Sequence, residues 1–379
     1  MAAATLNKYR DPTLDILKGL AILNIVVIHT VFWSGQSYIP YDSIRQVTLF
    51  IDVPLFFFLS GWAVSISRKT FSNVIKQYVR LFSQYAAIVV FLFLILATVF
   101  QTPPSTQTLL QWLLLQNFDS GNLPVVMASM WFLVVYLVVY LTAPLGWYLQ
   151  KHKAVLLVLI AMSSMLIALF SFTDVSIQYA SLYSIVNVRQ FVFYATFFFL
   201  GFYSKDLYLS MIEFIASFGL ISVAFIVYLS HLQFSLDLQG NKFPPTLFYF
   251  IASLFAILIA IYAKNYTSYI KTQIIAGNKL MRFLNYSGKN YFAIYLSQGF
   301  GASLIIPLSL YLVRADLHWA GILIICFIVN IVIAYSIAFV FIPIHHIIYG
   351  YFSSRIDRMF QRSKNATNLN ETLNGRGRC

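Results

Sequence analysis

The sequence predicts an all-α protein: a polytopic transmembrane helical bundle of about ten transmembrane helices, with the N- and C-termini in the cytoplasm. Three observations support this fold class: the composition, the length of the apolar blocks, and the placement of Lys and Arg. Of the 379 residues, 60% are hydrophobic and 10% are charged, whereas a soluble domain carries roughly 25% charged residues. Polar groups cover much of a soluble protein's surface, so we expect the outer surface of this chain to face lipid.

The apolar residues form ten blocks that are about long enough to cross a membrane. A helix needs about 20 residues to cross a hydrocarbon core about 30 Å thick. A transmembrane barrel would instead require alternating polarity, which Ala86–Phe100 does not show. The blocks are 13–33, 47–66, 79–100, 130–149, 154–172, 190–204, 211–230, 246–263, 289–311 and 319–345.

The distribution of positive charge predicts the orientation of these blocks. With the N-terminus inside, the inside segments hold 20 of the 25 Lys and Arg residues. The outside segments hold only Arg45, Arg189, Lys242 and Arg314, and Lys18 lies within the first block. Positive charge favours the cytoplasmic side and attracts anionic lipid, so the net charge of +13 does not indicate a nucleic-acid partner. Some inside residues are also candidates to hold a polyanionic ligand.

Two parts of the chain are distinguished by composition. Residues 1–345 are predicted to form one membrane domain, and residues 346–379 a basic cytoplasmic tail that is disordered after about residue 361. The segment 109–115 is too short to span and suits a helix in the membrane interface. The two cysteines, Cys326 and Cys379, provide neither a disulfide framework nor the spacing of a metal site.

The first block carries three ionisable residues on one helix face. At about 100° per residue, Asp15, Lys18 and His29 fall within an arc of about 60°. His29 lies about 16 Å beyond Lys18 toward the outside. An ionisable group inside a membrane helix costs at least about 2.5 kcal/mol and marks a functional site. Two plainer interpretations remain: Lys18 extends to the inner interface and pairs with Asp15, and His29 is a neutral histidine bonded to another helix.

The second block begins with a carboxylate at a depth similar to that of His29. Asp52 near an imidazole would select its tautomer and raise its basicity, so the pairing of Asp52 with His29 is a hypothesis. The alternative is that Asp52 is a solvated residue at a helix start. Later in this block, Ser60-Gly61 predicts a close contact between helices.

These two blocks resemble the opening of the integral-membrane acyltransferase-3 family, which includes bacterial O-acetyltransferases of surface polysaccharides. The family often has Arg in place of Lys18, and often has His near Ser297-Gln298, so the role of Gln298 stays open. The similar segments are Asp15-Ile-Leu-Lys18-Gly19 followed ten residues later by His29, Pro54-Leu-Phe-Phe-Phe-Leu-Ser60-Gly61, and more weakly Trp131-Phe-Leu, Phe197-Phe-Phe-Leu-Gly201 and Gly288-Lys-Asn-Tyr-Phe-Ala-Ile-Tyr-Leu296.

The resemblance implies a multi-pass enzyme of the bacterial cell membrane. It would be an O-acetyltransferase that moves an acetyl group from cytoplasmic acetyl-CoA to a hydroxyl of a cell-surface or lipid-linked glycan, without a metal. The implied site has His29 and Asp52 as catalytic residues, Lys18, Asp15 and Arg10 as donor-binding residues, and Trp33, Trp131 and Arg189 as acceptor-binding residues. The tryptophans equally suit an interfacial aromatic belt.

Two other classes of function fit the same polar residues. An exporter of a glycan or small organic acid would use them as a pathway, although the sequence shows no inverted repeat of the kind common in transporters. A sensor or scaffold would need neither Lys18 nor His29. Turnover of acetyl-CoA that depends on His29 distinguishes the enzyme from both.

Overall fold

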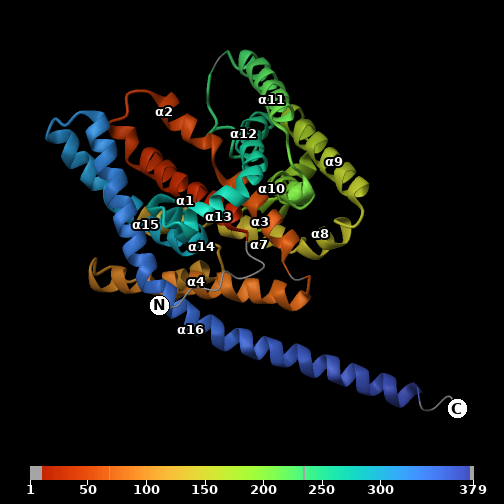
Figure 1. Cartoon of the computed structure of the whole chain (residues 1–379). Coiled ribbons are helices and arrows are strands. Elements are labelled where there is room, and N and C mark those ends of the chain that lie inside the picture. Colours follow the sequence, from red (N-terminus) through yellow and green to blue (C-terminus); the bar gives the residue numbers. More distant parts are fainter. Residues whose placement is uncertain (1–10, 68, 234, 376–379) are drawn as a thin grey trace.

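The computed structural model describes residues 11–67, 69–233 and 235–375, and these are almost entirely helical (Figure 1). The strands β1 (Ser181–Tyr183) and β2 (Val186–Asn187) form one antiparallel hairpin. The α-helices are α1 (Pro12–Trp33), α2 (Asp42–Val47), α3 (Val53–Ile66), α4 (Phe71–Thr98), α5 (Thr106–Leu113), α6 (Pro124–Ala128), α7 (Trp131–Tyr140), α8 (Ala143–Leu149), α9 (Lys153–Phe172), α10 (Val188–Tyr203), α11 (Met211–His231), α12 (Leu247–Ala263), α13 (Thr267–Ile275), α14 (Lys279–Lys289), α15 (Tyr291–Arg314) and α16 (Trp319–Gly375). Short 3₁₀ helices are η1 (Gly35–Ser37), η2 (Thr48–Phe50), η3 (Ser176–Tyr179), η4 (Ser204–Asp206) and η5 (Lys264–Tyr266).

The predicted helical membrane bundle is confirmed, but the number of spans is not. Within the described ranges, eight helices are long and apolar enough to cross a membrane, and a ninth span exists if Pro124–Tyr140 and Ala143–Leu149, bent by 47°, are counted as one. The predicted block 190–204 corresponds to α10. Its 16 residues extend about 24 Å, less than the roughly 30 Å of a hydrocarbon core, and most of its side chains are buried among other helices.

The second predicted block is interrupted just before α3. The block 47–66 covers η2 and α3 and follows α2, and Ile51 and Asp52 have non-helical conformations between η2 and α3. Asn24 of α1 donates its side-chain amide to the backbone carbonyls of Thr48 and Ile51, at 2.8 and 2.5 Å. Pro54 occupies the first turn of α3, where its missing N–H costs nothing. The interruption is therefore held by α1, and it sets the position of Asp52.

Helices α3 and α10 approach each other through two glycines. A Cβ on Gly61 would collide with the backbone oxygen of Phe198, and a Cβ on Gly201 would collide with that of Phe58. Small residues allow such close approach of two backbones. The close contact predicted at Ser60-Gly61 is confirmed.

Helices α1 and α14 are joined in the same way. A side chain at Gly19 would meet the backbone of Leu284, and one at Gly288 would meet the backbone of Asp15. These contacts hold the N-terminal half of α1, which carries Asp15 and Lys18, directly against α14.

The last helix leaves the bundle as a long arm. Figure 1 shows α16, in blue, passing along the bundle and extending well beyond it. Lys76 of α4 forms an ion pair with Asp357 of the arm at 2.5 Å. The helix passes residue 361, where the sequence predicts that disorder begins, and reaches Gly375; the segment 351–374 contains no Pro or Gly to interrupt it.

Candidate active site

A cavity of about 780 Å³ lies at the N-terminal end of α1. This volume lies within the range of small-molecule sites, roughly 300–1,000 Å³. Three cations line it from three helices: Lys18 of α1, Arg80 of α4 and Lys289 of α14. Two carboxylates, Asp11 and Asp15, also line it. We call this space the main cavity; its positive side chains suit an anionic ligand.

The start of α1 forms one wall of the main cavity. Asp11 caps the helix by accepting a hydrogen bond from the backbone N–H of Thr13 at 2.9 Å, and burial raises the pKa of the Asp11 carboxyl above its ordinary value of 3.8. Lys18 Nζ lies 5.0 Å from the centre of the Tyr291 ring of α15, within cation–π range. Arg10, predicted to bind the donor, lies outside the described residues.

Three turns farther along α1, His29 bonds to a glutamine of α15. Its Nδ1 lies 2.8 Å from Oε1 of Gln298. A carbonyl oxygen only accepts, so Nδ1–H is the donor and the neutral ring keeps a lone pair on Nε2. Gln298 is fully buried, and its Nε2 has no hydrogen-bond partner among the described residues.

Helix α15 therefore provides contacts to both functional positions on α1. Tyr291 contacts Lys18 and Gln298 contacts His29. These two residues are seven apart on α15, which places them on one face to within about 20°. Hence the face of α1 that carries Lys18 and His29 points toward α15 and the protein interior rather than toward lipid.

A small apolar void of about 10 Å³ lies next to the main cavity, and one of its lining residues, Ile25, is about one helical turn before His29 on α1. Tyr291 lines both the void and the main cavity. The other lining residues come from α1, α7 and α15 and from the start of α3; they are Ile25, Val53, Phe56, Phe132 and Tyr295. All the described residues that line this void are apolar or aromatic.

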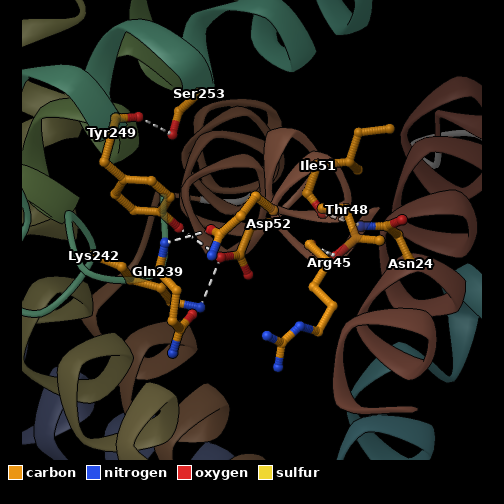
Figure 2. Close-up of polar contacts among 10 residues, drawn as sticks. Asn24, Arg45, Thr48, Ile51, Asp52, Gln239, Lys242, Tyr249 and Ser253 are labelled. Carbon is orange, nitrogen blue, oxygen red and sulfur yellow. Dashed lines mark hydrogen bonds and ion pairs between the residues drawn. The ribbon is translucent and has the colours of Figure 1, made fainter. Parts of the chain in front are cut away.

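Asp52 forms a buried ion pair with a lysine that the sequence places 190 residues away. Figure 2 shows Lys242 and Tyr249 converging on the Asp52 carboxylate. Lys242 Nζ and the Tyr249 hydroxyl each donate to Asp52 Oδ2 at 2.7 Å, and the Lys242 and Asp52 side chains are only 7% and 1% exposed. Asp52 Oδ1 is buried and has no hydrogen-bond partner in the part of the chain that the structure describes.

The structure gives Asp52 hydrogen-bond partners other than the predicted His29. The partner of His29 Nδ1 is Gln298, whereas Asp52 Oδ2 is bonded to Lys242 and Tyr249. Asp52 is not solvated, and although it precedes α3 its side chain makes no capping hydrogen bond.

The predicted acceptor-binding residues lie in three different surroundings. Trp131 begins α7, and its ring lies 5.2 Å from Lys242 Nζ, beside the ion pair. Arg189 is buried and donates to the Pro245 carbonyl and to Gln178 Oε1, at 2.8 and 3.1 Å. Through these bonds Arg189 links the segment at Gln178 to the segment at Pro245. They do not indicate that Arg189 contacts a substrate. Trp33 ends α1 and is 38% exposed.

Sequence reasoning missed Lys242 and left Gln298 without a role. Lys242 is one of only four basic residues in the predicted outside segments. The positive-inside rule treats it only as a contribution to the orientation of the chain. Gln298 was visible as a polar residue in the ninth apolar block. Neither signal identifies the partner, because each partner lies on a distant helix.

Comparison with protein families identifies the family of the chain. The family described as an acyltransferase domain matches residues 11–354. The chain belongs to the acyltransferase-3 family. Searches of curated proteins and of solved structures found no significant match.

The family match covers the complete site. It begins at Asp11, which caps α1, and ends within α16, so it includes every residue named above around the main cavity and His29. The protein is accordingly a multi-pass membrane acyltransferase, as the opening blocks predict. An acyltransferase needs a place for an activated acyl donor and a base for the acceptor, and the basic cavity and the imidazole lie on one line along α1.

Proposed function

We propose that this acyltransferase moves an acetyl group from cytoplasmic acetyl-CoA to a hydroxyl of a cell-surface or lipid-linked glycan outside a bacterial cell. The observation that carries the proposal is the line along α1 from a basic cavity to an imidazole with an available nitrogen. Lys18 lines the cavity, and His29 is held by Gln298 about 16 Å farther along the helix.

The main cavity suits the donor. CoA is a polyanion, and Lys18, Arg80 and Lys289 provide three cations for its phosphates. The positive-inside pattern predicts that this end of α1 lies at the cytoplasm, where acetyl-CoA is available. The acyl-bearing arm would extend past Tyr291 and Ile25, which line the small void, to bring the thioester to His29.

The chemical step requires one base and no metal. His29 Nε2 takes the proton from the acceptor hydroxyl as that oxygen attacks the thioester carbonyl. The carbon–sulfur bond then breaks, the acetyl group stays on the acceptor oxygen, and the CoA sulfur leaves and takes up a proton. Gln298 keeps its bond to Nδ1–H throughout, so the ring stays oriented when it becomes positively charged.

The acceptor would enter beside the buried ion pair. Asp52 Oδ1 is an acceptor without a partner, and a sugar hydroxyl would satisfy it. Trp131, next to Lys242, offers an aromatic face for a sugar ring. These are the features that support a glycan as the acceptor.

Two measurements test the proposal. Purified protein with radiolabelled acetyl-CoA should release or transfer the label, and His29→Ala should reduce the rate by roughly 10²- to 10⁴-fold, whereas the exposed His152→Ala should not. Mass analysis of surface glycans should show one acetyl group less per modified unit without the gene. If acetyl-CoA stays intact with the wild-type protein, the proposal is wrong and export becomes the better interpretation.

A further inference from the structure

A second cavity of about 350 Å³ adjoins the main cavity. Arg80 of α4 and Lys289 of α14 line both spaces. The second space is completed by Gln84 of α4 and by His345 and His346 of α16, among others. We call it the side pocket. It is a branch of the main cavity toward the last helix.

The side pocket has the charge of an anion site. It shares the cations Arg80 and Lys289, and the centres of the His345 and His346 rings lie 5.7 Å apart. No Asp or Glu is among the described residues that line it, whereas Asp11 and Asp15 line the main cavity. Basic side chains without a neighbouring carboxylate favour a phosphate group.

Some polar side chains of the side pocket are held by neighbouring residues, and one buried polar atom lacks a hydrogen-bond partner among the described residues. His345 is buried, its Nδ1 lies 3.2 Å from Ser83 Oγ, and its ring stacks on Tyr349 at 5.7 Å between centres. Gln84 is 9% exposed, and its Oε1 has no hydrogen-bond partner within residues 11–67, 69–233 and 235–375. Buried acceptors are normally hydrogen-bonded, so this oxygen can accept a hydrogen bond from a ligand hydroxyl or a water molecule.

We infer that the side pocket binds a phosphate ester that carries a neighbouring hydroxyl. The phosphate would lie against Arg80, Lys289 and the histidines, and the hydroxyl would donate to Gln84. A volume of about 350 Å³ admits a phosphate with a ribose or glycerol unit but not a whole CoA. Two ligands have this chemistry: the 3′-phosphorylated ribose of the donor, which rests on the proposed function, and the headgroup of phosphatidylglycerol, because basic pockets between membrane helices bind anionic lipid.

The test uses one position that belongs to the side pocket alone. His346 is exposed at its edge, so a charged substitution does not disturb the interior. His346→Glu places a negative charge at the pocket, and His346→Arg places a permanent positive charge there. The matched control is His152→Glu, an exposed histidine between α8 and α9 that lines neither cavity.

Two probes are measured on the full-length protein in detergent and in nanodiscs. The first is calorimetric binding of CoA and of 3′-dephospho-CoA. The second is retention of phosphatidylglycerol against phosphatidylcholine, measured by native mass spectrometry. Relative to His152→Glu, we expect His346→Glu to weaken binding of the pocket's ligand by about tenfold, because a like charge now faces its phosphate. We expect His346→Arg to strengthen the same binding.

The pattern of results assigns the ligand. Weaker binding of CoA with unchanged 3′-dephospho-CoA identifies the donor's nucleotide phosphate; loss of phosphatidylglycerol with unchanged CoA identifies the lipid. If both His346 variants behave like His152→Glu toward both probes, the inference is overturned. If the wild-type protein binds neither CoA form, the proposed function fails, and the lipid measurement still decides the side pocket.

Discussion

At the scale of single residues, the bond between His29 and Gln298 decides which ring nitrogen is available for chemistry. A glutamine oxygen that accepts from Nδ1–H leaves Nε2 unprotonated. Replacing Gln298 by leucine keeps the size of the side chain but removes the acceptor, so both tautomers and several ring orientations become accessible. We expect Gln298→Leu to lower kcat by roughly 10- to 100-fold and to leave KM for acetyl-CoA within about twofold, measured by steady-state acetyl transfer or hydrolysis.

The neighbouring serine provides the control for this prediction. Ser297 is as deeply buried as Gln298, but its hydroxyl has no hydrogen-bond partner among the residues that the structure describes. Ser297→Ala should therefore keep wild-type kcat. Equal losses in both variants would show that this part of α15 is sensitive to packing rather than to the acceptor on Gln298.

A second prediction concerns the buried ion pair of Asp52 and Lys242. Removal of one charge leaves the other buried without compensation, which costs about 3–5 kcal/mol. Lys242→Met should therefore lower the free energy of unfolding by about that amount, because only the Tyr249 hydroxyl would remain on Asp52 Oδ2. The double variant Asp52→Asn with Lys242→Met should recover most of the loss. Unfolding in mixed micelles measures both.

Activity measurements distinguish two roles of this ion pair, stabilising the fold and binding the acceptor. If the ion pair also receives the acceptor, the double variant should fold well and still transfer acetyl groups poorly to the glycan. A single Lys242→Met variant as stable as the wild type would contradict the buried geometry of the pair.

At the scale of elements, the glycine contact between α3 and α10 holds the start of α3, and hence Asp52, in place. Gly201→Ala adds a Cβ that collides with backbone atoms of α3, and backbone cannot move aside as a side chain can. We expect a loss of about 1–3 kcal/mol of stability, the usual cost of overpacking, together with reduced activity. Thermal unfolding monitored by intrinsic fluorescence measures the first effect.

Helix α11 offers the matched control. A Cβ on Gly219 meets nothing within 4 Å, so Gly219→Ala should be neutral or stabilising by up to about 1 kcal/mol, since alanine is the better helix former. A Gly201→Ala variant that unfolds like Gly219→Ala would show that the two helices do not approach as closely as described.

The same elements show what can be predicted from the sequence. Apolar length alone located every long helix, and the period of 3.6 residues placed Lys18 and His29 on one face, because both depend only on neighbours along the chain. The interruption at Ile51 could not be predicted, since it depends on the amide of Asn24 from another helix. The block 190–204 is predicted to span; α10 has only 16 residues and most of its side chains are buried among other helices, and this burial depends on packing that the sequence alone does not reveal.

Contacts between residues far apart in the chain could not be predicted from the sequence, because they depend on how the helices pack. The hypothesis of an Asp52–His29 bond assumed that equal depth implies contact, but depth leaves the position around the bundle undetermined. Lys242 and Gln298 reach their partners across 190 and 269 residues. Only the packing of α1 against α15, and of α3 beside α12, brings these groups together.

At the scale of the whole molecule, the two cavities and the arm of α16 share one end of the bundle. Helices α1 and α15 both begin at the main cavity, and α16 returns to the side pocket at His345 before it continues past Asp357, which is paired to α4. The side of the membrane reached by the end of the chain therefore reports the side on which the donor would enter.

This side can be measured without any substitution. Cys326 is fully buried, and the labelling experiment uses the other cysteine of the chain, Cys379, as the target of a membrane-impermeant maleimide. Because the basic segments predict a cytoplasmic end, we expect no labelling in intact cells and complete labelling after the membrane is opened. Labelling of intact cells would place the main cavity outside, away from cytoplasmic acetyl-CoA, and would contradict that donor while leaving the acyltransferase family assignment unchanged.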